Sequence, residues 1–189
     1  MKSPQARYEI RIAGFGGQGI VTIGHILGSA FSVHEGINSV NTQSYGPESR
    51  GGACRSEVVV SSGVIQYPYV READCFVALS QLALDRYGSS LKPDGLLLVE
   101  ADSVAIAPAD IQGKLFAVPT MEIARETGNI KFQNSVALGA LYWLIQDRIA
   151  EESLKKALAE SVPRPTLAAN SAAFDRGRQY LQTSATQQS

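Results

Sequence analysis

Two glycine-rich segments near the N-terminus hold the residue types that could bind an anionic group. The first has the pattern Gly-x-Gly-x-x-Gly, and its candidate binding residues are Gly14, Gly16, Gly17, Gln18 and Gly19. Glycines let a backbone turn tightly, so that N–H groups at the start of a helix come close to a phosphate. Because this segment lies between a predicted strand and a predicted helix, it matches the dinucleotide-binding pattern in context as well as in sequence.

The second half of the dinucleotide pattern is missing. Proteins that bind NAD carry an acidic residue at the end of the second strand, where this sequence has Asn41, Thr42 and Gln43. Glu35 precedes that strand, and the nearest arginine that could face a 2′-phosphate is Arg50. The pattern therefore favours a glycine turn that serves packing, another phosphate or a partner chain over a nicotinamide or flavin site.

The second segment combines a charge pair and a hydroxyl with turn residues. Its candidate binding residues are Tyr45, Gly46, Glu48, Ser49, Arg50, Gly51 and Gly52. Arg50 beside two glycines could approach an anion closely, and the segment leaves the second strand at the sheet edge where open α/β sheets bind ligands. The alternative is a turn with an exposed Glu48–Arg50 ion pair, which contributes little. Ligand binding or subunit contact is favoured, because loops at this edge commonly carry function.

The elements that must position these segments follow from hydrophobic periodicity. Alternating apolar residues predict a strand at Tyr8–Ile12, an apolar stretch predicts a helix up to about Val33, and Ile37–Thr42 predicts a second strand. This order predicts a βαβ unit with parallel pairing and a right-handed crossover. Ala53–Ser61 and Val64–Tyr67, joined by a turn, predict a β-hairpin.

Further along, apolar runs predict buried strands, and a Pro-Asp-Gly sequence in Lys92–Gly95 predicts a turn. The strands are expected at 75–79, 96–99 and 114–118, and helices at 81–87, 121–126, 132–145, 151–160 and 170–181. Residues 1–182 are predicted to form one α/β domain, and 183–189 a disordered tail. The expected fold is an open, mostly parallel, Rossmann-like sheet with an added β-hairpin and a helical C-terminal part.

Single residues outside the two segments are interpreted as structural. Cys54 shares a predicted strand face with valines and Cys75 begins a buried strand, so both are expected in the core. His25 and His34 have no partner at metal or triad spacing. Asn134 and Asn170 are interpreted as helix N-caps.

Composition excludes several classes of function. Lys and Arg total 17 against 18 Asp and Glu, and no basic run occurs, so nucleic acid is not an expected partner. No apolar run is long enough to span a membrane and no signal sequence is recognised, so a cytoplasmic location is expected. Two cysteines cannot supply the four ligands of an iron–sulfur cluster.

Several separated motifs, in order along the chain, together resemble one family. They lie at 11–20, 43–53, 55–58, 78–81, 91–95 and 134–140. From about Tyr8 to about Tyr180 the chain resembles the gamma subunit of the 2-oxoacid:ferredoxin oxidoreductases, within the pyruvate/ketoisovalerate oxidoreductase gamma domain family. The wording of the 45–52 segment is closer to the 2-oxoglutarate and pyruvate types than to the indolepyruvate type.

The resemblance implies oxidative decarboxylation of a 2-oxoacid, with 2-oxoglutarate preferred, in which coenzyme A becomes acyl-CoA, CO2 is released and ferredoxin is reduced. It implies thiamine diphosphate, Mg2+ and [4Fe-4S] clusters on alpha and beta subunits, with a delta subunit as a further candidate partner. This chain then has no catalytic residue, metal site or cofactor of its own, and is inactive when isolated. A homodimer is an alternative for an isolated copy. The competing hypotheses are a free-standing NAD(P)- or flavin-dependent Rossmann oxidoreductase and a module that binds an anionic metabolite.

Overall fold

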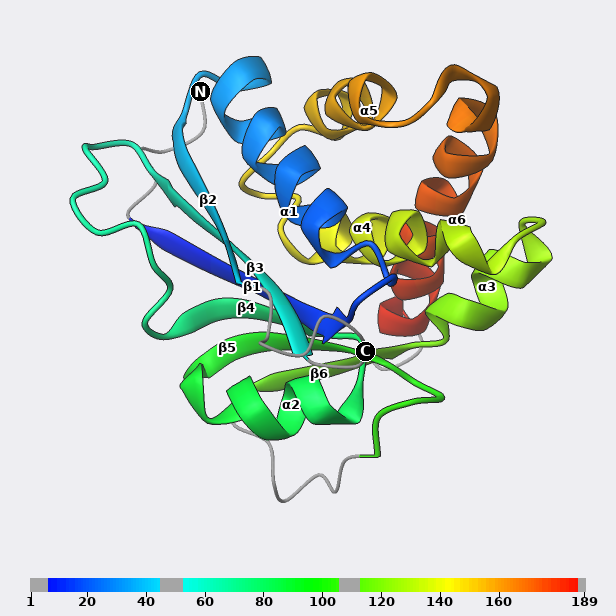
Figure 1. Cartoon of the computed structure of the whole chain (residues 1–189), viewed down its shortest axis with the longest axis horizontal. Helices are drawn as coiled ribbons and strands as arrows, with labels where there is room; N and C mark the ends of the chain where they lie inside the picture. The colour runs from blue at the N-terminus through cyan, green and yellow to red at the C-terminus, as the bar shows by residue number, and fades with distance from the viewer. Residues whose placement is uncertain (1–6, 45–52, 106–112, 187–189) are drawn as a thin grey trace.

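A mixed six-stranded sheet runs through the computed structural model, which describes residues 7–44, 53–105 and 113–186 (Figure 1). The strands are β1 (Tyr8–Phe15), β2 (Asn38–Ser44), β3 (Ala53–Ser61), β4 (Ala73–Ala78), β5 (Leu91–Glu100) and β6 (Lys114–Val118). Their order across the sheet is β2-β3-β1-β4-β5-β6. The predicted α/β class with a mostly parallel sheet is confirmed, because β1, β4, β5 and β6 pair in parallel.

Helices cover both faces of this sheet unequally (Figure 1). They are α1 (Ile20–Ser29), α2 (Gln81–Tyr87), α3 (Thr120–Glu126), α4 (Gln133–Leu144), α5 (Glu151–Ser161) and α6 (Leu167–Thr186). Helices α1, α4, α5 and α6 bury the larger apolar core against one face, whereas α2 covers a smaller core on the other face. None of the helices in the described ranges is both long enough and apolar enough to cross a membrane.

The predicted pairing of the first two strands is wrong. β2 runs in the same direction as β1, but β3 lies between them and pairs antiparallel with both. The physical reason lies in burial: Val58, Val59 and Val60 of β3 are fully buried, whereas the polar strand β2 is partly exposed throughout. A strand with apolar side chains on both faces is most stable inside a sheet, and the polar strand takes the edge.

The strand predicted at Val64–Tyr67 does not form, so the antiparallel pair in this fold is β2 with β3. The segment is irregular, and its carbonyl groups bond to a side chain instead of a neighbouring strand. The Arg7 guanidinium donates to the carbonyl oxygens of Tyr67 and Tyr69 at 2.7 and 2.9 Å. Pro68, directly after the predicted strand, has no backbone N–H with which a longer strand could pair.

The turn predicted at Lys92–Gly95 lies inside β5, and it appears as an interruption of pairing. Between Ala73 and Cys75 of β4, the paired position on β5 moves from Leu91 to Leu96. The turn residues therefore do not pair with β4, although β5 continues through them.

The predicted helices are all present, with shifts at their ends. α2 has the predicted bounds, and Ser80 caps it by accepting a hydrogen bond from the Ala83 N–H at 3.2 Å. α6 begins at Leu167, three residues before its expected start, and continues to Thr186, so the first residues of the expected tail are helical. Residues 187–189 lie outside the described residues.

Asn170 is not an N-cap, because α6 begins at Leu167, and its side chain instead joins α6 to the closely packed α4. A Cβ added to Gly139 of α4 would lie 1.9 Å from the carbonyl oxygen of Phe174 of α6, so the two backbones touch. Asn170 lies within α6, where it accepts a hydrogen bond from the Ser135 hydroxyl at 2.7 Å and donates to the Thr166 carbonyl at 2.9 Å. It therefore bridges the two helices.

Candidate functional site

The first glycine segment joins β1 to α1 at the carboxyl edge of the parallel strands. The Gln18 side chain closes this loop: its Oε1 accepts from the Phe15 N–H at 2.6 Å, and its Nε2 donates to the Leu79 carbonyl at 2.9 Å. A side chain at position 14 would collide with it, because an added Cβ would lie 2.3 Å from Gln18 Oε1. These bonds hold the loop against the end of β4. The chain leaves β1 toward one face of the sheet and leaves β4 toward the other, and open α/β sheets bind ligands at such a point.

The start of α1 is suited to an anion. Gly19 is its N-cap in a left-handed conformation (φ +73°), and no side chain caps the helix. The first turn contains no acidic residue, so nothing there offsets the positive end of the helix dipole. Added Cβ atoms at Gly16 and Gly17 would meet no atom of the described residues within 4 Å, so those residues leave the outer side of the loop open.

Sequence reasoning gave Asn134 the wrong role at this site. The interpretation as an N-cap is wrong, because Phe132 is the N-cap of α4 and Asn134 lies in the first turn. Its side chain packs on Gly19: an added Cβ there would lie 2.7 Å from Asn134 Cβ. Asn134 Oδ1 is buried and has no hydrogen-bond partner among the described residues. Buried polar atoms nearly always have a partner, so this amide points to a missing donor. The position of Asn134 in the 134–140 motif is the sequence signal that could have indicated this site.

A buried carboxylate holds α4 in this position. Glu100, at the end of β5, is fully buried and accepts from the Thr120 hydroxyl and from the Met121 N–H, the latter at 3.2 Å. Gln133, the first residue of α4, donates to Thr120 Oγ1 at 3.1 Å. Glu100 thereby links β5 to the starts of α3 and α4, and no motif in the sequence indicated it.

The second segment, Tyr45–Gly52, lies outside the described residues, but its two ends are placed. Ser44 ends β2 opposite Arg55, and Ala53 begins β3 opposite Phe15, the last residue of β1. Both ends therefore lie at the sheet edge that carries the glycine loop. The strand beside β1 at this edge begins with Ala53 and Cys54, and neither is an acidic residue that could bind a ribose.

Neither cysteine is placed for reactivity. Cys54 and Cys75 are buried members of the larger core, as predicted, and burial raises the pKa of the Cys75 thiol from 9.0 to about 12. Burial also raises the pKa of Cys54. Within the described ranges, no cluster of three or more His, Cys, Asp or Glu side chains could hold a metal ion.

We expect neither thiol of the folded chain to react with Ellman's reagent at pH 8, because the thiolate is the nucleophile and both thiols are buried. Denaturation should release two reactive thiols. The raised pKa also means that the stability contributed by the neutral Cys75 is present below pH 9.0 and is lost as the pH rises toward about 12. Rapid reaction of one thiol of the folded chain with Ellman's reagent would contradict this placement.

Comparison with known proteins gives consistent matches over nearly the whole chain. The family model described as pyruvate ferredoxin/flavodoxin oxidoreductase matches residues 9–180. The 2-oxoglutarate synthase subunit KorC of Methanocaldococcus jannaschii is 42% identical, over 90% of this chain and 92% of that protein.

Two solved structures extend this likeness. A keto/oxoacid ferredoxin oxidoreductase gamma subunit from Geobacter sulfurreducens has a TM-score of 0.81 at 38% identity, over 91% of this chain and 96% of that one. The 2-oxoglutarate:ferredoxin oxidoreductase of Magnetococcus marinus, with 2-oxoglutarate, coenzyme A and succinyl-CoA bound, has a TM-score of 0.82 at 28% identity. This chain matches 32% of that longer chain with 95% of its own length.

Proposed function

This chain belongs to the pyruvate ferredoxin/flavodoxin oxidoreductase family as a homologue of gamma subunits, and we propose that it serves a multisubunit 2-oxoglutarate:ferredoxin oxidoreductase by bordering the coenzyme A route. In that enzyme, coenzyme A is the acyl acceptor, and thiamine diphosphate with Mg2+ and [4Fe-4S] clusters supply the carbanion and electron chemistry on alpha and beta subunits. A delta subunit and ferredoxin complete the proposed set of partners.

The observation that carries the proposal is the pairing of Phe15 with Ala53. It brings the start of the glycine loop and the end of the 45–52 segment to the same place on the carboxyl edge, where open α/β sheets bind ligands. The start of α1, which no described side chain caps, and Asn134 Oδ1, which has no hydrogen-bond partner among the described residues, lie beside it. Backbone N–H groups at a helix start suit a phosphate-bearing ligand such as coenzyme A.

The residues of this chain fit a bordering role better than a catalytic one. Two buried cysteines cannot ligate a [4Fe-4S] cluster, and the described residues contain no acidic cluster for Mg2+. What this chain offers is a rigid loop, a helix start and the Arg50 cation. These groups can orient an anionic substrate while the reaction takes place on other subunits.

Replacing Arg50 with alanine in the assembled complex is expected to raise the KM for coenzyme A or for the 2-oxoacid. A hydrogen bond to a charged group contributes about 1.5–3 kcal/mol, which corresponds to a rise of roughly 10- to 100-fold. Arg164→Ala is the matched control, because Arg164 is exposed at the connection between α5 and α6. Steady-state kinetics with each substrate varied in turn measure the effect, and unchanged KM and kcat for both substrates would overturn the role of Arg50.

Purification of the native chain tests the assignment as a whole. The proposal expects larger subunits to co-purify, with the brown colour of iron–sulfur clusters and with 2-oxoacid-dependent reduction of ferredoxin. A chain that purifies alone, and whose Tm rises on addition of NAD(P), would support the free-standing dinucleotide enzyme instead.

A further inference from the structure

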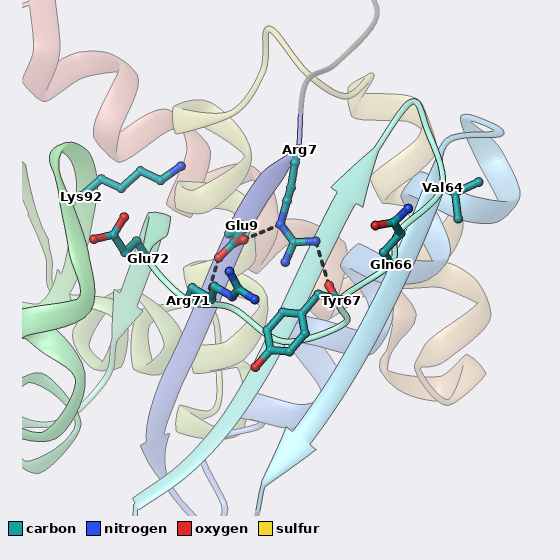
Figure 2. A pocket seen from close by; sticks show the side chains of 8 residues that line it. All are labelled: Arg7, Glu9, Val64, Gln66, Tyr67, Arg71, Glu72 and Lys92. Carbon is teal, nitrogen blue, oxygen red and sulfur yellow. Dashed lines mark hydrogen bonds and ion pairs between the residues drawn. The ribbon is translucent and has the colours of Figure 1, made fainter.

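A second exposed surface lies at the opposite end of β1 from the glycine loop. The segment 62–72, which connects β3 to β4, carries Val64, Tyr67, Tyr69 and Arg71, and we name these four residues the Tyr67 surface. Val64 is 86% exposed, Tyr67 42% and Tyr69 50%. Val64, Tyr67 and Arg71 border an open pocket of about 550 Å³ that also includes Arg7, Glu9 and Lys92 (Figure 2).

The segment is irregular, yet specific contacts hold it in place. Arg7 donates to the carbonyl oxygens of Tyr67 and Tyr69 at 2.7 and 2.9 Å, and its Nε lies 2.5 Å from Glu9 Oε1. Glu9 Oε2 accepts from the Arg71 backbone N–H at 2.7 Å. Figure 2 shows the contacts of Arg7 with Glu9 and Tyr67, and that of Glu9 with Arg71. A surface that is already ordered costs less conformational entropy when it binds a partner.

Arg71 has a side chain available for a further contact. Its guanidinium lies over the Tyr67 ring, 4.4 Å from the centroid, and forms no ion pair with any residue of the described ranges. The Glu9 carboxylate already pairs with Arg7. Lys92 pairs with Asp74 at 2.6 Å, and Glu72 lies on the Lys92 side of the pocket (Figure 2). A cation held on an aromatic ring, with unused N–H donors, suits a carboxylate.

We propose that the Tyr67 surface docks another subunit of the same oxidoreductase, which presents a carboxylate side chain to Arg71 and an apolar side chain to Val64 and Tyr67. Tyrosine and arginine dominate the binding energy of protein interfaces, and the two tyrosines pack edge to face at 5.5 Å. A small molecule would leave most of Val64 in water, whereas a protein surface covers it. The identity of the partner rests on the function proposed above.

The first test uses a new thiol. Because Cys54 and Cys75 are buried, Val64→Cys provides a cysteine that can be labelled selectively with a benzophenone maleimide. In the assembled complex, photolysis is expected to join this chain to another subunit, identified by mass spectrometry. Val33→Cys, at a second exposed valine (69%), is the matched control and should give little of that product. Absence of the product, or a product that joins only two copies of this chain, would overturn the docking proposal.

The second test reverses the charge of Arg71. Arg71→Glu should weaken retention of this chain by the tagged partner subunits at least tenfold, while the Tm of the isolated chain stays close to that of the wild type. Arg86→Glu is the control, since Arg86 is also exposed and lies over a tyrosine ring, Tyr87, at 5.6 Å. If wild type and Arg71→Glu assemble equally well, the docking surface is wrong and the proposed function stands. If the wild type assembles with no oxidoreductase subunit, both are wrong.

Discussion

Replacing Gly19 with alanine is expected to destabilise the chain strongly. Gly19 has φ +73°, a conformation that costs other residues about 1–2 kcal/mol. The new Cβ would also lie 2.7 Å from Asn134 Cβ, and overpacking of this kind costs about 1–3 kcal/mol. The expected loss is about 2–5 kcal/mol, a fall in Tm of roughly 5–15 °C.

The structure supplies a matched control for Gly19→Ala. Gly17 also has a positive φ, +99°, but a Cβ added there meets no atom within 4 Å. Gly17→Ala therefore carries the backbone strain without the collision, and its Tm should fall by less. In the double variant Gly19→Ala with Asn134→Gly, the collision is removed and part of the lost stability should return. Equal Tm values for Gly17→Ala and Gly19→Ala would show that the contact with α4 is not tight.

Breaking the buried ion pair between β1 and β3 is expected to destabilise the chain even more. Arg11 and Glu57 are 5% and 2% exposed, and Arg11 Nε lies 2.9 Å from Glu57 Oε1. Arg11 also donates to the Val70 carbonyl at 3.0 Å and to the Ser90 hydroxyl. Arg11→Met leaves the buried Glu57 with Arg55, at 3.5 Å, as its one remaining ion-pair partner among the described residues, and removing one partner of a buried pair typically costs about 3–5 kcal/mol.

A double-mutant cycle separates the interaction energy of the Arg11–Glu57 pair from the cost of leaving one buried charge unpaired. Arg11→Met with Glu57→Leu removes both charges, and we expect its free energy of unfolding to exceed that of Arg11→Met alone. Urea unfolding measures each step. Lys156→Ala, which removes an exposed pair with Glu152, should change little. A loss for Arg11→Met as small as that for Lys156→Ala would contradict the importance of the buried pair.

Much of the fold could be predicted because its signals are local. Apolar periodicity located β1, β4 and the helices, and α2 has the predicted bounds because Ser80 caps it. The alternation in Ala53–Ser61 correctly placed Arg55 and Glu57 on one face and Cys54 on the other, which faces the larger core. Burial of Glu57 was not predictable, because its partner Arg11 is 46 residues away in the sequence.

The order of the strands is the main feature that local patterns missed. The βαβ pattern predicts that the first two strands pair, but β3 takes that place because its valines gain more from burial on both faces than the polar β2 does. Lys92–Gly95 could not be placed for the same reason. Its turn residues lie within β5 but do not pair with β4, and only the register between the two strands shows this. Pairing depends on competition between strands, which no single segment contains.

The sequence by itself determined that this is an α/β chain with a glycine loop between a strand and a helix, and that two cysteines cannot hold an iron–sulfur cluster, because these are properties of local patterns and composition. Its motifs also indicated the family. Only the tertiary structure decided that β3 stands between β1 and β2, that Asn134 of α4 packs on Gly19, and that Arg7 orders the Tyr67 surface. Each of these depends on contacts between residues far apart in the chain, and their free energy arises only when the whole sheet and its helices are packed.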